Sequence, residues 1–138
     1  MTSAFKAGSK GLLIASLFAA LLAGCATNPA QTPEDIVRVR SKEYWVSLLS
    51  GKFETAYESL SPSYRRVNSF AKYRGAFGQG AQWVRAEVTA VRCEPEKCTA
   101  SVELTVKPLI VGFSGTITSG IEEQWVLEGG RWWLSPKN

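Results

Sequence analysis

The amino-acid sequence predicts an α+β fold, with helices in its first half and an antiparallel sheet in its second half. Between residues 33 and 77 the apolar residues recur with helical spacing, and from residue 84 onward many recur at every second position. Near the C-terminus the pair Gly129-Gly130 separates two strand-like segments, as a tight hairpin turn requires. Helices followed by a meander of strands are typical of the α+β class.

The first helix is predicted to begin at Pro33. Thr32 can cap it, proline suits the first helical position, and two acidic residues favour the positive end of the helix dipole. Gly51 can end this helix. Its apolar stripe consists of Val37, Tyr44, Trp45, Leu48 and Leu49.

Two short helices are predicted to follow. In the first, apolar residues occupy positions i, i+3, i+4 and i+7, and Ser61-Pro62 ends the helix. The second begins at Ser69 and is interrupted by Gly78 and Gly80. The apolar residues of the two helices are Phe53, Ala56, Tyr57 and Leu60, and then Phe70, Tyr73 and Phe77.

Four strands are predicted after these helices. Residues 84–90 alternate apolar and polar side chains, and so do residues 100–106. The glycine pair leads into a last strand at residues 131–135. The third strand carries Ile117, Ile121, Trp125 and Leu127.

The connection at residues 109–113, with the sequence LIVGF, is unusually apolar. Two interpretations remain open for it. It extends a strand, or it is an exposed lip that contacts a partner, a ligand or the bilayer.

Residues 1–24 are predicted to be an export signal. Lys6 and Lys10 form a positive region, and the apolar run Leu12–Ala23 follows with 12 residues and no charge. This run is well short of the roughly 20 residues that span a bilayer as a permanent helix. The alternative is a buried core helix, but such helices rarely start behind two lysines without a polar face.

The segment Leu22-Ala23-Gly24-Cys25 at the end of this run resembles the lipobox of bacterial lipoproteins. The resemblance implies that the Cys25 thiol receives a diacylglyceryl group, that the signal is removed, and that the new amine can be acylated, for example with palmitate. Two or more acyl chains anchor a protein stably in a membrane. Ala26 stands where aspartate would resemble an inner-membrane retention signal, so we expect an outer-membrane lipoprotein that faces the periplasm.

Removal of the signal would leave residues 25–32 as a lipidated tether and residues 33–138 as the folded domain. The net charge of the 138-residue chain is +4, and loss of Lys6 and Lys10 lowers it to +2. So small a charge, without a basic run longer than Arg65-Arg66, gives no case for nucleic-acid binding.

Histidine is absent from the sequence. This excludes Ser-His-Asp and Cys-His catalysis, and also zinc or haem sites that use histidine. The only aspartate is Asp35, and its position at a helix start is explained by capping. We therefore expect no metal, no cofactor and no enzymatic activity.

Cys93 and Cys98 flank a turn-like tetrapeptide between two predicted strands, where facing residues lie close enough for a disulfide. The predicted export would bring this pair into an oxidising compartment. The alternatives are a redox pair and a metal site. The spacing differs from the C-x-x-C of thioredoxin-like centres, and two cysteines without histidine make a poor metal site.

The strand register next to this turn contains a conflict. If Cys93 faces Cys98 in strict register, Val88 faces Glu103, so that an apolar side chain lies beside a polar one. A one-residue bulge between the turn and Val88 would remove the conflict. The other solution places a different set on the inner face: Trp83, Glu87 and Val91.

The order of these elements, the segment Gly51–Pro62 and the segment Gln124–Leu134 resemble the NTF2-like superfamily over roughly residues 33–136. The resemblance implies a cone in which a long helix packs into a curved antiparallel sheet and leaves a pocket at the wide end. The superfamily includes isomerases, dehydratases, dimerisation modules and envelope lipoproteins. Its enzymes commonly use Asp, His and Tyr in the pocket, and none of these matches a motif in this chain.

Five tryptophans follow Cys25, and they either fill the core of a small sheet or line an apolar pocket. Glu123 shares the strand phase of Trp125, so its side chain is expected to point inward. There it could be a base with a raised pKa, pair with an arginine such as Arg85, or lie on an open edge. The residues expected to line a pocket are Trp45, Tyr57, Trp83, Glu123 and Trp125.

These features predict a lipid-anchored envelope protein with a non-catalytic binding or structural role. We expect its partner to be a protein, a second copy of the chain or a small apolar ligand. One alternative is a small pocket enzyme of the isomerase or dehydratase kind that uses Glu123 and a tyrosine. A third is an accessory subunit of an envelope or secretion assembly.

Overall fold

The computed structural model describes residues 30–77 and 81–137, and Gln31–Asn138 forms one compact unit. The predicted signal sequence, Cys25, and the glycines Gly78 and Gly80 lie outside the described residues. No helix in the described ranges is both long and apolar enough to cross a membrane.

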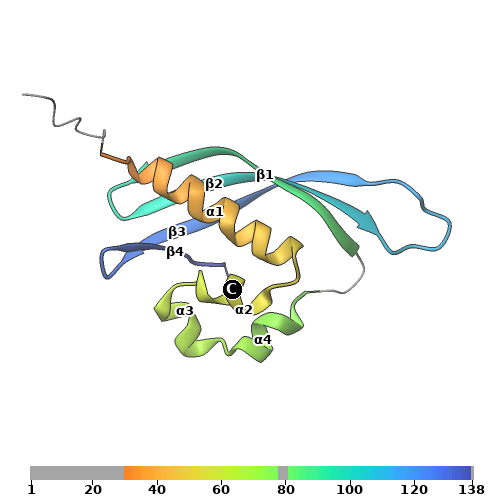
Figure 1. Ribbon diagram of the computed structural model, residues 1–138, viewed down its shortest axis with the longest axis horizontal. Helices are drawn as coiled ribbons and strands as arrows, with labels where there is room; N and C mark the ends of the chain where they lie inside the picture. Colours follow the sequence, from red (N-terminus) through yellow and green to blue (C-terminus); the bar gives the residue numbers. More distant parts are fainter. Residues whose placement is uncertain (1–29, 78–80, 138) are drawn as a thin grey trace, which may run out of the picture. The chain divides into compact units, whose positions relative to one another are not determined.

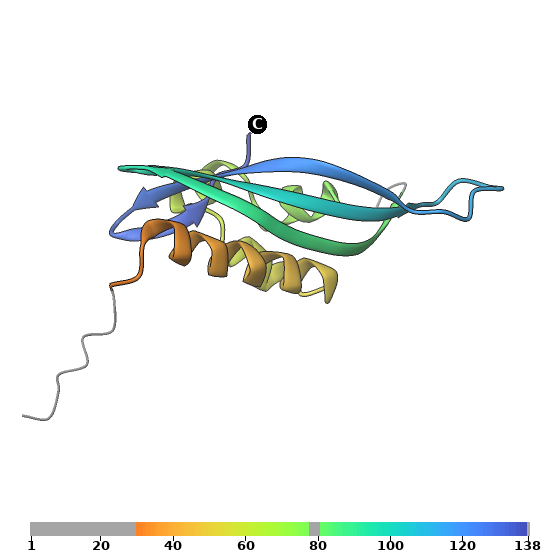
Figure 2. The same cartoon turned by 90° about the horizontal axis from the view of Figure 1, so that it is seen from above.

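Four helices precede four strands along the described chain, which is the order predicted for an α+β fold. They are α1 (Pro33–Leu49), α2 (Phe53–Glu58), α3 (Pro62–Val67), α4 (Phe70–Gly75), β1 (Ala81–Glu94), β2 (Lys97–Pro108), β3 (Ile117–Glu128) and β4 (Arg131–Leu134). The strands form an antiparallel sheet in the order β1-β2-β3-β4, and the sheet is curled (Figures 1 and 2). α1 lies across one face of this sheet, where it packs mainly against β1 (Figure 2).

α1 begins where the sequence predicts. Thr32 and Asp35 form a capping box: Thr32 Oγ1 accepts from the Asp35 amide at 3.2 Å, and an Asp35 carboxylate oxygen accepts from the Thr32 amide at 3.3 Å. The prediction is wrong for one residue of the stripe. Leu49 is the last residue of the helix, and its side chain is exposed rather than buried. The residues buried along α1 are Val37, Ser41, Tyr44, Trp45 and Leu48.

The short helices follow the prediction in part. α2 begins at Phe53 and α4 begins after Ser69, whose hydroxyl accepts from the Lys72 amide. The prediction that Ser61-Pro62 ends the first short helix is wrong, because α2 already ends at Glu58. The pair instead starts α3, which was not predicted: the Ser61 hydroxyl accepts from the Tyr64 amide at 3.1 Å and proline takes the first helical position.

The C-terminal hairpin confirms the predicted turn. Gly129 and Gly130 have φ values of 62° and 76°, which L side chains rarely adopt, and they join β3 to β4. The free edge of β4 is then bridged by the α2–α3 linker. The Leu134 amide donates to the Ser59 carbonyl at 3.0 Å, and the Ser61 amide donates to the Leu134 carbonyl at 2.8 Å.

The conflict in the β1–β2 register is resolved by bulges. Cys93 pairs with Cys98, and a register shift between Val88 and Ala90 brings Val88 opposite Val102. A second shift lies between Trp83 and Arg85. Each shift changes which side chains point inward, so β1 draws its inner face from both predicted sets. The β1 residues that pack against the core are Trp83, Ala86, Val88, Val91 and Cys93.

Of the two interpretations of residues 109–113, the strand extension is wrong. β2 ends at Pro108, and the chain turns through Gly112 with a φ of 81° before β3 begins. This loop and the β1–β2 turn lie at opposite ends of the sheet (Figure 1). α1 stops short of the β2–β3 loop (Figure 2), and the apolar side chains of the loop are exposed.

Candidate functional site

A buried carboxylate lies between α1 and the sheet. Glu123 points inward from β3, as the strand phase predicts, and is only 7% exposed. Its carboxylate accepts three hydrogen bonds: from the Ser41 hydroxyl at 2.6 Å, from Trp45 Nε1 at 2.6 Å and from Trp125 Nε1 at 3.0 Å. We call Glu123, Ser41, Trp45 and Trp125 the carboxylate cluster.

The electrostatics of the carboxylate cluster reflect two opposing effects. Burial raises the pKa of the Glu123 carboxyl above its ordinary value, because the charged form loses its hydration. The hydrogen bonds from Ser41, Trp125 and Trp45 favour the charged form and offset part of this rise. Of the three alternatives for Glu123, pairing with Arg85 does not occur, since Arg85 contacts the exposed Glu87 on the same strand.

The proposed pocket residues do not gather around one cavity. Trp45 and Trp125 hold Glu123 directly, and Trp83 packs edge-on against Trp45 with ring centres 5.8 Å apart. Tyr57 lies elsewhere. Its hydroxyl donates to the Asn68 carbonyl at 2.7 Å and its ring packs against helix α4, because α2 turns its side chain toward the other helices.

Aromatic side chains fill the space beside the carboxylate cluster. Trp125 is completely buried, and Tyr44 packs edge-on against Trp45 with ring centres 5.6 Å apart. The Tyr44 and Tyr73 hydroxyls lie 3.2 Å apart, and burial raises the pKa of Tyr73 to about 12. Both tyrosines are therefore protonated at neutral pH, where Tyr73 donates to Tyr44.

A shallow groove of about 220 Å³ runs between α1 and β1. This volume is below the range typical of small-molecule sites, about 300–1,000 Å³. Trp45 borders the groove, but Glu123 does not line it. The lining residues are Lys42, Trp45, Val46, Leu49, Ala86, Glu87 and Val88.

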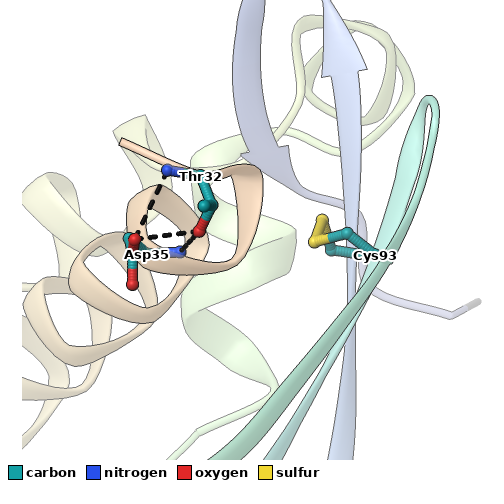
Figure 3. Close-up of a disulfide and its surroundings, with 4 residues drawn as sticks. Thr32, Asp35 and Cys93 are labelled. Carbon is teal, nitrogen blue, oxygen red and sulfur yellow. Dashed lines mark hydrogen bonds between the residues drawn. A yellow bond between two sulfur atoms is a disulfide. The ribbon is translucent and has the colours of Figure 1, made fainter. Parts of the chain in front are cut away.

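The β1–β2 turn carries a disulfide between Cys93 and Cys98, whose Cα atoms are 4.0 Å apart. Figure 3 shows that the disulfide lies close to the Thr32–Asp35 cap at the start of α1. Cys98 is completely buried. In the described part of the chain no three carboxylate, cysteine or histidine side chains gather to hold a metal ion.

The β2–β3 loop presents an unpartnered apolar surface. Leu109 and Ile110 are 65% and 63% exposed, Phe113 is 42% exposed, and Val111 is fully exposed. Contiguous exposed apolar side chains on a soluble domain mark interaction sites more often than isolated ones do. This outcome matches the second interpretation of the segment, an exposed lip. We call Leu109, Ile110, Val111 and Phe113 the apolar loop.

Sequence reasoning missed Ser41, the helix residue that holds Glu123. A signal was present, since Ser41 lies four residues after Val37 and four before Trp45, on the apolar stripe of α1. A polar residue on a buried stripe indicates a buried polar partner.

Comparisons with known proteins bear on the fold alone. No protein-family model matches the chain, and no curated protein matches it. A similar solved structure is the solution structure of a SEC-C motif containing protein from Rhodopseudomonas palustris. It superimposes with a TM-score of 0.54 at 18% sequence identity, over 76% of each chain.

Proposed function

We propose that this chain is a lipid-anchored envelope protein whose NTF2-like domain binds a protein partner through the apolar loop. The anchor would be Cys25, on the periplasmic side of the outer membrane, followed by a tether over residues 25–32. The role is non-catalytic binding, either in a homodimer or as an accessory subunit of an envelope assembly.

The exposure of the apolar loop is the observation that carries the proposal. Burying a side chain such as leucine, valine or phenylalanine contributes about 1.5–3 kcal/mol. Leu109, Ile110 and Val111 lack most of this stabilisation in the isolated domain, and Phe113 lacks a smaller part of it. Between Leu104 and Ile121 the only charged residue is Lys107, so little charge would have to be desolvated when a partner covers the loop.

The carboxylate cluster supports a non-catalytic role over the isomerase or dehydratase alternative. A general base must be within hydrogen-bond reach of the substrate proton that it removes. The oxygens of Glu123 are engaged by Ser41, Trp45 and Trp125, and aromatic rings fill the neighbouring space. The same packing argues against a small apolar ligand between helix and sheet.

The test is photo-crosslinking in intact cells, with a photoreactive residue in place of Val111. A matched control carries it in place of Val67, which is exposed on α3 outside the apolar loop. We expect one discrete protein adduct from position 111 and none from position 67. An adduct of twice the chain mass would identify a second copy. Equal labelling from both positions, or lipid adducts alone, would overturn the proposal.

The anchor has a separate test in the Cys25→Ala variant. We expect this change to abolish labelling by a palmitate analogue and to release the protein from the membrane fraction. The control is Cys93→Ala with Cys98→Ala, which leaves Cys25 in place and should keep the label. Labelling that persists without Cys25 would refute the anchor and leave the loop proposal standing.

A further inference from the structure

Three arginines surround one tryptophan ring at the β4 edge of the domain. The guanidinium carbons of Arg40, Arg65 and Arg131 lie 5.5, 5.6 and 4.4 Å from the ring centre of Trp133. The arginines come from α1, α3 and the first residue of β4. Trp133 Nε1 donates to the Glu128 carbonyl at 3.0 Å, and this hydrogen bond fixes the orientation of the ring.

None of these arginines has a carboxylate partner among the described residues. The ion pairs found there join Arg85 to Glu87 and Arg92 to Glu122. Two acidic side chains near the arginines form no ion pair with them among the described residues. Glu128 is the cross-strand partner of Arg131, but its carboxylate accepts from the Ser63 hydroxyl at 2.8 Å. Glu43 raises the pKa of Arg40 without contacting it as an ion pair.

The arrangement leaves donors unused. The Nε atoms of Arg40 and Arg65 are buried and have no hydrogen-bond partner in the described part of the chain. Burial and the nearby positive charge of Arg131 lower the pKa of Arg40, because both disfavour its charged form. Stacking on an indole uses the face of a guanidinium and leaves its in-plane N–H donors available.

We propose that Arg40, Arg65 and Arg131 form a binding site for a phosphate group, with Trp133 as the platform that orients the three guanidinium groups. Arginine presents its donors in a planar fork that matches phosphate oxygens bidentately. Three such forks from three elements suit a tetrahedral anion with several oxygens. Arg131 is exposed and the other two are half-buried, so the site opens to solvent beside Arg131.

The phosphate group could belong to a free phosphorylated molecule or to a lipid headgroup. The experiment separates these sources with two probes, inorganic phosphate and glycerophosphoglycerol, a headgroup without acyl chains. Binding of each probe to the purified full chain is measured by calorimetry, with acetate as a carboxylate probe. A preference for one phosphate probe identifies the source. Acetate binding as tight as phosphate binding would overturn the phosphate assignment.

Variants make the test specific. Arg131→Gln and Arg65→Gln should each weaken binding by about tenfold, the loss expected for one charge-assisted pair of about 1.4 kcal/mol. The matched control is Arg66→Gln, which removes the same charge from the neighbouring position on α3, where Arg66 contacts Ser63. Thermal unfolding verifies that each variant is folded, and Arg131 is the safest position because it is exposed.

Two further outcomes would refute the site. Equal weakening by Arg66→Gln would mean that only the overall charge matters. The absence of saturable binding of both phosphate probes to the unaltered chain would remove the proposal, and it would leave the function proposed for the apolar loop untouched.

Discussion

The carboxylate cluster and the apolar loop are opposites. In the first, a group that is costly to bury lies inside the domain with three hydrogen-bond donors around it. In the second, side chains that favour burial lie in solvent without cover. The carboxylate has hydrogen-bond partners inside the domain, whereas the apolar side chains of the loop are mostly uncovered. The difference teaches that a costly buried group is compensated within this fold, and that the loop is a region with apolar surface still to be buried.

The largest expected effect comes from removing the buried carboxylate. Glu123→Ala leaves the Ser41 hydroxyl and two indole N–H groups without an acceptor and opens a cavity, so we expect a loss of roughly 3 kcal/mol in the free energy of unfolding. Urea denaturation measures it. The control is Glu122→Ala, which removes an exposed neighbour and should change stability by less than about 0.5 kcal/mol. Equal effects of the two changes would contradict the comparison.

The next largest effect is expected from the disulfide in the β1–β2 turn. Replacing Cys93 and Cys98 by alanine removes the cross-link that closes the β1–β2 turn. For so short a loop the chain-entropy estimate is about 2 kcal/mol. Thermal unfolding with and without a reducing agent measures the loss, and the reducing agent should no longer matter in the double variant. An unchanged melting temperature would mean that packing of Cys98 alone stabilises this end.

A pH series sharpens the account of Glu123. Its pKa is raised on folding from the ordinary 4.5, so the folded state binds a proton more readily than the unfolded state. Its stabilising contribution is therefore complete below pH 4.5 and is lost as the pH rises through the raised folded-state pKa. The difference in the free energy of unfolding between the original chain and Glu123→Gln should therefore change with pH over this interval. Parallel curves would show that Glu123 does not titrate differently on folding.

The smallest effect on stability is expected in the apolar loop. Val111→Ser alters a side chain that touches nothing in the domain, so the free energy of unfolding should change by less than about 0.5 kcal/mol. Binding should still fall, measured as loss of the adduct from a photoreactive residue placed at Ile110. A large loss of stability would place Val111 in the structure of the domain rather than in its interactions.

Local signals predicted much of this fold. The capping residues of α1, the glycine turn before β4 and the inward phase of Glu123 each depend on neighbours within a few positions. The bulge near Val88 was one of two predicted solutions, and the inner face of β1 takes residues from both. Each shift in register depends on how β1 pairs with β2, which lies outside the local sequence pattern. Sequence alone could not choose between these solutions.

Other features depend on contacts between distant segments. Tyr57 and Trp45 were both predicted to line a pocket because they are aromatic residues of amphipathic helices. Trp45 contacts Glu123, whereas the direction of α2 points Tyr57 toward Asn68. The gathering of Arg40, Arg65 and Arg131 has no sequence signature, since it requires α1, α3 and β4 to meet. Helix α3 was missed because Ser61-Pro62 was interpreted only as a stop.

The bridge between the α2–α3 linker and β4 has a consequence for the timing of folding. Leu134 pairs with Ser59 and Ser61, and Glu123 bonds Ser41 across 82 positions of the sequence. Contacts of such long range form only after the loops between them close, which slows folding. The packing of α1 against β3, and of the α2–α3 linker against β4, therefore cannot be completed before β3 and β4 are in place. Folding of this domain should accordingly be slower than that of a helical domain of similar size, in which most contacts are local.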